Sequence, residues 1–164
     1  MKARRSKADI VAFVETNCLH AEVLELDGAT ERVEDAAAMV GANPEQIVKS
    51  VVFIVAAQPV LVLGLGTRRI DRAKIARHLG VRARDVRLAR RDEVLAITGY
   101  EAGAVPPVGH ADSLPVLADT ALSGLEDVYA GGGSPHALLH IAAADLLVLS
   151  RATLVDVMER KKDA

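Results

Sequence analysis

Apolar and polar residues alternate along this chain with two different periods, and each period predicts its own kind of element. Apolar residues lie three or four positions apart in segments that predict helices over residues 6–17, 33–40, about 75–79, 92–98 and 145–149. The first segment opens with a capping-box pattern from Ser6 to Asp9. The second and third stop at Gly41 and Gly80, and glycine is the residue that most often ends a helix.

Shorter apolar runs predict strands over residues 21–26, 51–57, 60–66, 114–119, 126–130 and 137–142. Gln58-Pro59 is expected to turn the second run into the third as a hairpin. Asn43-Pro44 opens a short helical turn, so Lys49 and Ser50 are expected where that turn meets the buried strand. Strands in consecutive pairs with helices between them predict an α+β fold, with a mixed, largely antiparallel β-sheet or barrel and helices packed outside.

The length and composition predict a single domain over residues 1–164. No run approaches the roughly 20 apolar residues of a membrane helix. The basic N-terminus MKARRSKADI leads into an amphipathic segment rather than the apolar core of a secretory signal. We therefore expect a cytoplasmic protein with no membrane partner. The single cysteine, Cys18, excludes an intrachain disulfide and is expected to be a half-buried thiol.

The charge balance limits the ways in which this chain could bind a nucleic acid. Twenty Lys and Arg against 22 Asp and Glu give a formal charge of −2, which argues against coating a nucleic acid by bulk electrostatics. Two Phe, two Tyr and no Trp are too few for a platform on which successive bases stack. Any nucleic-acid contact is therefore expected to be local, and DNA is not an expected partner.

Several familiar kinds of site are not predicted. The five histidines show no metal-binding spacing such as HExxH, and there is no Cys/His cluster. Neither GLGTRR nor AGGGS matches the glycine patterns of nucleotide-binding loops, and no GxSxG elbow of a serine hydrolase is present. The sequence thus predicts neither a metal nor a cofactor.

Three features remain that could form a site: Lys49, the stretch GYEAGAVPPVGH at residues 99–110, and the glycine run at 131–133. Taken one at a time they are typical of a solvated lysine, a stiff turn and a hairpin connection. Glycine also lets main chain approach a ligand closely, and proline fixes the shape of a loop.

The segments TERVEDAAAMVGANPEQIVKSVVFIV, ITGYEAGAVPPVG and VYAGGGSPHALLHI resemble, in order and approximate spacing, the YbaK/prolyl-tRNA synthetase-associated editing domain. The resemblance covers nearly the whole chain. Its most specific parts are the IVKS segment and the Gly-x-x-x-Pro motif, which corresponds to the run from Gly103 to Pro107. It implies a barrel-like domain that hydrolyses the ester of a wrongly charged aminoacyl-tRNA, often a tRNA for proline that carries alanine or cysteine.

The resemblance also implies roles for individual residues. Gly103 would bring main chain close to the 3′-terminal adenosine and the ester, and Lys49 would hold the terminal phosphate or the substrate by its charge. Backbone N–H groups would stabilise the oxyanion, with no acid–base pair evident. Catalytic positions are assigned to Lys49, Gly103 and Pro107, and substrate contacts to Ser50, Gly99, Ala104, Val105, Pro106, Gly131, Gly132, Gly133 and His136.

The expected partners are the acceptor end of an aminoacyl-tRNA and prolyl-tRNA synthetase. Ser50 follows the lysine where Asn is more usual in members that remove alanine, so the amino acid removed stays open. Two other functions also stay open. One is a non-catalytic tRNA- or synthetase-binding module of the same fold, and the other is a hydrolase of free aminoacyl esters.

Overall fold

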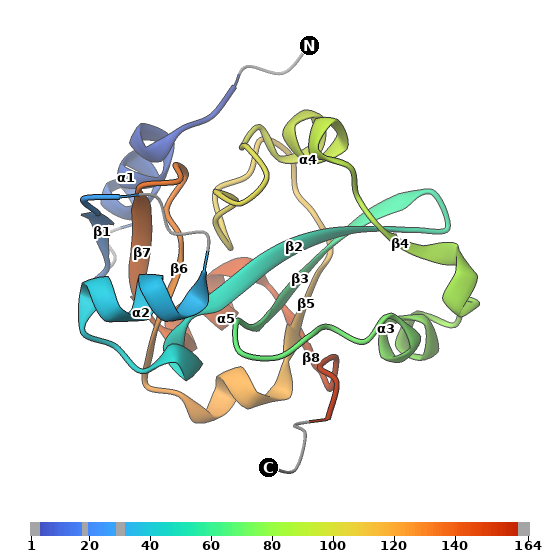
Figure 1. Cartoon of the computed structure of the whole chain (residues 1–164). Helices are drawn as coiled ribbons and strands as arrows, with labels where there is room; N and C mark the ends of the chain where they lie inside the picture. The colour runs from blue at the N-terminus through green and yellow to red at the C-terminus, as the bar shows by residue number, and fades with distance from the viewer. Residues whose placement is uncertain (1–3, 18–19, 29–31, 161–164) are drawn as a thin grey trace.

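The computed structural model of the chain describes residues 4–17, 20–28 and 32–160, in which helices flank two β-sheets (Figure 1). The α-helices are α1 (Lys7–Thr16), α2 (Val33–Val40), α3 (Arg72–Leu79), α4 (Arg91–Thr98) and α5 (Ala143–Ser150). Three 3-10 turns are η1 (Pro44–Gln46), η2 (Ala83–Asp85) and η3 (Thr120–Gly124). The strands are β1 (Glu22–Glu25), β2 (Val48–Val55), β3 (Gln58–Leu65), β4 (Val86–Leu88), β5 (Val116–Asp119), β6 (Asp127–Gly131), β7 (Ala137–Ala142) and β8 (Thr153–Val155).

The larger sheet has the strand order β4-β2-β3-β5-β8, and the smaller has the order β1-β7-β6. Pairing is antiparallel except between β3 and β5 and between β5 and β8. A parallel bridge between Ile47 and Tyr129 joins the start of β2 to β6 and so links the two sheets. The expected α+β fold with a mixed, largely antiparallel sheet is confirmed.

The helix boundaries follow the capping residues. The Ser6 N–H donates a 2.8 Å hydrogen bond to the Asp9 carboxylate at the start of α1. Gly41 and Gly80 end α2 and α3 in the left-handed region, with φ of +68° and +71°. Cys18 lies outside the described residues. No helix in the described part of the chain is long and apolar enough to cross a membrane.

The β2–β3 hairpin differs from the sequence prediction at both ends. β2 begins at Val48, before the apolar run, so Lys49 pairs with Gly64 inside a strand rather than at a helix-to-strand junction. Pairing uses backbone groups, so a strand can extend through polar residues. The turn is Ala56-Ala57, with φ of +46° and +70°, while Gln58 belongs to β3. A two-residue turn with positive φ matches the twist of the strands it joins.

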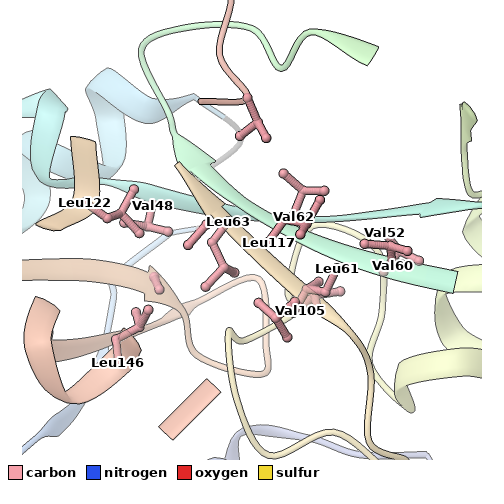
Figure 2. Close-up of a cluster of buried hydrophobic side chains, with 14 of the residues drawn as sticks. Val48, Val52, Val60, Leu61, Val62, Leu63, Val105, Leu117, Leu122 and Leu146 are labelled. Atoms are coloured by element: carbon pink, nitrogen blue, oxygen red, sulfur yellow. The ribbon is translucent and has the colours of Figure 1, made fainter. Parts of the chain in front are cut away.

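The core lies around β3, which runs between β2 and β5. Leu61, Val62 and Leu63 are fully buried, because both faces of this central strand are covered. Figure 2 shows their side chains together with those of β2 and β5, with Leu146 of α5, and with Val105. Val105 comes from the loop that connects α4 to β5, so this loop is attached directly to the core.

Candidate functional site

A cavity of about 360 Å³ lies along one edge of β2. β4 pairs with this edge beside residues 53–55, and among the described residues the first half of β2 has no neighbouring strand of the larger sheet on this side. The cavity is lined by residues 47–52, by α2, by the start of α4 with the residues before it, by the loop around Gly103, and by β6 and β7. Strands of both sheets, together with the helices α2 and α4, therefore form the walls of this cavity.

Main-chain groups of β2 face this cavity. The Gly66 N–H donates a 2.7 Å hydrogen bond to the Ile47 carbonyl, and on the opposite edge the Ala89 N–H donates at 3.0 Å to the Val52 carbonyl. Because hydrogen-bonded and non-hydrogen-bonded pairs alternate in an antiparallel ladder, Val48 and Ser50 direct their N–H and C=O groups away from β3. The bridge from Ile47 to Tyr129 occupies the start of this edge, so the main-chain groups of Ser50 are the ones that the open edge of β2 offers to a ligand in the cavity.

The Ser50 side chain adds a second polar feature. Its hydroxyl oxygen is buried and has no hydrogen-bond partner among the described residues. Ser50 lies on the same face of β2 as the buried Val48 and Val52, since side chains two apart share a face. A buried hydroxyl without a partner costs free energy of about 1–3 kcal/mol, so a ligand able to pair with it would recover that cost.

Lys49 projects from the opposite face of β2 to Ser50. Its ammonium donates a 2.5 Å hydrogen bond to the Arg68 carbonyl in the segment that follows β3. Burial lowers the pKa of this ammonium, the positive charge of Arg69 lowers it further, and Glu159 partly opposes the shift. Lys49 therefore contributes to the cavity lining while its charge is held at the start of the segment that leads to α3.

Gly103 forms the apex of a tight turn at the cavity. The Ala104 N–H donates a 3.0 Å hydrogen bond to the Glu101 carbonyl, and Gly103 adopts a φ of +91°. Apart from the two chain neighbours of Gly103, no described residue would have an atom within 4 Å of a Cβ added there. The main chain at this turn is consequently open to a ligand.

The glycine run at 131–133 packs against the loop that contains Gly103, at Ala104 and Val105. A Cβ at Gly131 would lie 2.2 Å from the Val105 carbonyl oxygen, so only glycine allows this approach. The Gly133 N–H donates a 3.0 Å hydrogen bond to the Ala104 carbonyl. The two glycine-rich segments, distant in sequence, are thus packed together.

The remainder of the loop is fixed by polar contacts. His110 Nε2 donates a 2.6 Å hydrogen bond to the Pro106 carbonyl, and the Tyr100 hydroxyl donates at 3.1 Å to the Gly109 carbonyl. Burial lowers the pKa of His110, the contact with Pro106 opposes this shift, and Arg5 adds to it. The His110 ring is therefore uncharged at neutral pH, and its hydrogen bond to the Pro106 carbonyl fixes the loop.

The cavity brings together only part of the residue set assigned from the sequence. Its lining includes Lys49, Ser50, Gly103, Val105 and Gly131. The other assigned residues do not line it: Gly99, Ala104, Pro106, Pro107, Gly132, Gly133 and His136.

These other residues have identifiable positions. Gly99 ends α4 with a φ of +85° and accepts a hydrogen bond from the Arg5 N–H. Pro106 and Pro107 are buried in the loop. His136 is exposed, and its N–H donates to the Ser134 hydroxyl.

Sequence reasoning missed the apolar lining, which includes Ala36, Leu88, Val94 and Leu138. It also missed Arg32, the residue before α2. Arg32, Ala36 and Leu138 lie in segments that resemble the family, but the sequence does not single them out, because the packing of separate elements places them at the cavity. In the described part of the chain, no three His, Cys, Asp or Glu residues are grouped so that they could hold a metal ion.

Residues 27–149 match the family model described as the aminoacyl-tRNA editing domain. A solved structure of a candidate trans-editing enzyme for prolyl tRNA synthetase is 37% identical, with a TM-score of 0.88, and the similarity covers 97% of this chain and 100% of that one.

Curated relatives are also similar. The uncharacterized protein YwhH of Bacillus subtilis (strain 168) is 30% identical over 126 residues, which are 76% of this chain and 78% of that protein. The proline--tRNA ligase of Geobacter sp. (strain M21) is 32% identical over 102 residues. That alignment covers 62% of this chain but 18% of the ligase, so the chain spans less than a fifth of the length of this relative.

Proposed function

Because the chain belongs to the aminoacyl-tRNA editing domain family, we propose that it is a deacylase that hydrolyses the ester of a mischarged aminoacyl-tRNA in the cytoplasm. We further propose a tRNA for proline as the carrier, and this choice is supported by the similarity to prolyl-tRNA synthetases and to the trans-editing candidate. The observation that carries the proposal is the cavity in which the open edge of β2 faces the Gly103 turn.

The reaction requires few protein side chains. Water attacks the carbonyl carbon of the ester, and the carbonyl oxygen takes the negative charge. The bond from this carbon to the ribose oxygen then breaks, and the ribose oxygen receives the proton that the water gives up. The products are a free amino acid and an uncharged tRNA.

Fixed backbone donors suit the charged intermediate of this reaction. They need no reorganisation as the oxyanion forms, and loss of one donor can cost about 10²–10³ in rate. The main chain at Gly103 and the open edge of β2 would supply such groups. The attacking water would be positioned by backbone and by the neighbouring ribose hydroxyl of the substrate itself.

Lys49 and Ser50 would have different tasks on the two faces of β2. The Lys49 ammonium would attract the terminal phosphate of the tRNA, since a lysine acts as a point charge for phosphate. The unpaired Ser50 hydroxyl would form a hydrogen bond with the bound aminoacyl group or its ribose. Of the remaining residues assigned from the sequence, those outside the lining would support the loop rather than touch the substrate.

The size and chemistry of the lining favour a small amino acid. The cavity volume is at the lower end of the range for ligand sites, about 300–1,000 Å³, and its side chains are mainly Ala, Val and Leu. A small apolar or thiol side chain such as that of alanine or cysteine would fit beside the terminal adenosine.

A deacylation panel tests the proposal. The unsubstituted protein is mixed with tRNA for proline charged with Ala, Cys, Ser or cognate Pro, and with tRNA for alanine charged with Ala or Ser. We expect release of a small non-cognate amino acid from the tRNA for proline, sparing of cognate prolyl-tRNA, and the same rate in EDTA. Release from no substrate, together with tRNA binding, would favour the non-catalytic module. Activity abolished by EDTA and restored by zinc would refute the metal-free mechanism.

A further inference from the structure

Positive charge is concentrated in one segment of this acidic chain. Residues 68–91 contain ten of the 20 Lys and Arg residues but only two of the 22 Asp and Glu residues. The segment therefore carries a formal charge of +8, and the rest of the chain carries −10. The near-neutral total conceals a strongly basic region.

The fold keeps this region on one side of the molecule. The segment runs through α3, η2 and β4, at the right of Figure 1, and continues to the start of α4 at the top. α3 contacts both η2 and β4, so the elements that carry these arginines are packed together. All of its arginines are exposed except Arg68, which is half-buried.

Ion pairs neutralise only part of this charge. Arg87 forms a two-point contact with Glu93 at 2.8 and 3.0 Å, and Lys74 pairs with Asp156 at 3.0 Å. Arg82 and Arg90 pair with nearby acids. Within the described residues, five exposed arginines of the segment have no ion-pair partner: Arg69, Arg72, Arg77, Arg84 and Arg91. Their guanidinium groups are free to bind an external anion.

The segment lines the cavity near one of its ends and contacts a lining residue, Lys49, near the other. At its start, the Arg68 carbonyl holds the Lys49 ammonium. Near its end, Leu88 and Ala89 line the cavity. A polyanion lying on the arginines would therefore have a chain end within reach of the cavity.

We propose that the exposed arginines of residues 68–91 bind the phosphate backbone of the tRNA acceptor arm and so direct its 3′ end into the cavity. This inference rests on the proposed deacylase function. Phosphate contacts fix position and orientation without reading sequence. Arginine suits this task, because its planar fork binds phosphate oxygens with two parallel hydrogen bonds.

The test compares two double variants that remove the same charge. Arg77→Gln with Arg84→Gln removes two unpaired arginines of the segment, and Arg151→Gln with Arg160→Gln removes two exposed arginines outside it. Each protein is titrated with uncharged tRNA for proline between 50 and 200 mM salt. Each lost phosphate contact lowers the salt slope by about 0.9, so the segment variant should lose roughly tenfold less affinity over this range than the unsubstituted protein. The control variant should behave like the unsubstituted protein.

A kinetic comparison separates this surface from the cavity. For the segment variant, KM for a charged tRNA that the protein deacylates should rise by on the order of tenfold, while hydrolysis of a 3′-aminoacyl-adenosine stays unchanged. An unaltered salt slope would overturn the proposal, as would an equal loss on aminoacyl-adenosine. If the unsubstituted protein hydrolyses no charged tRNA, the proposed function fails, and the salt titration with uncharged tRNA still decides whether this surface binds it.

Discussion

Replacing Gly103 with alanine tests whether the open main chain at the cavity takes part in hydrolysis. Beyond its two chain neighbours, the added Cβ would meet no atom of the described residues within 4 Å, so packing adds no cost. The φ of +91° does add strain for alanine, of about 1–2 kcal/mol for a left-handed residue. For a protein of this size, that strain corresponds to a fall in Tm of about 2–8 °C.

The effect on the reaction should be much larger than the effect on stability. A methyl group at this turn would displace the ester or its backbone donors, and a displacement of about 1 Å can cost on the order of a hundredfold in rate. We expect kcat for deacylation to fall by about that factor, measured by release of labelled amino acid from mischarged tRNA. Thermal unfolding of the same sample measures the strain.

Gly41→Ala is the matched control. Gly41 also has a positive φ, +68°, also has no atom within 4 Å of an added Cβ, and does not line the cavity. It should therefore show a comparable fall in Tm with unchanged kcat. If Gly103→Ala gives the expected fall in Tm and keeps full kcat, the turn is a structural feature only and its backbone has no part in catalysis.

Three further predictions address the side chains. Lys49→Ala should reduce deacylation at least tenfold with little change in the unfolding transition, because the ammonium is expected to bind the substrate phosphate. Unchanged activity in a variant that unfolds at the same temperature as the unsubstituted protein would remove Lys49 from the mechanism. Ser50→Ala should raise the free energy of unfolding by about 1 kcal/mol in a denaturant titration, because it removes a buried hydroxyl that has no partner among the described residues. The same variant should slow deacylation about tenfold. A loss of stability with an unchanged rate would contradict the role given to Ser50. The pKa of His110 is lowered in the folded state, so the unfolded chain binds its proton first and stability should fall as the pH drops below about 6.5. Unfolding titrations at pH 7.5 and 5.5 should therefore show a smaller pH effect for His110→Gln than for the unsubstituted protein, and an equal effect would assign the acid sensitivity to other groups.

The sequence predicted the helices and most of the strands, because those signals are local. The caps at Ser6, Gly41 and Gly80 lie where the sequence placed them. The short strands β4 and β8 were not predicted. Each has three residues and pairs with a strand distant in the chain, so its pairing depends on tertiary structure.

The candidate site was less accessible to prediction for a similar reason. Glycine-rich motifs led to both Gly103 and Gly131, but they did not separate a residue open to the cavity from one that only permits close packing. The unpaired Ser50 hydroxyl and the contacts of Lys49 depend on which face of β2 each residue occupies, and this required the correct start of the strand. The lining residues at α2 could not be identified from the sequence, because they reach the cavity only through the packing of this helix.

The support of the Gly103 loop by α1 has a consequence for where the functional unit ends. The region matched by the family, residues 27–149, leaves out α1, yet an added Cβ at Gly109 would lie 3.1 Å from Ile10 and one at Gly133 would lie 2.9 Å from the Lys7 backbone nitrogen. The Arg5 N–H also donates a 2.6 Å hydrogen bond to the Gly99 carbonyl at the entry to the loop. A protein trimmed to residues 27–149 would keep every residue of the cavity lining but lose these contacts to the loop that contains Gly103. We therefore expect that a fragment with the proposed activity must be longer than the segment that matches the family, and that a graft of this site onto another protein must carry α1 with it.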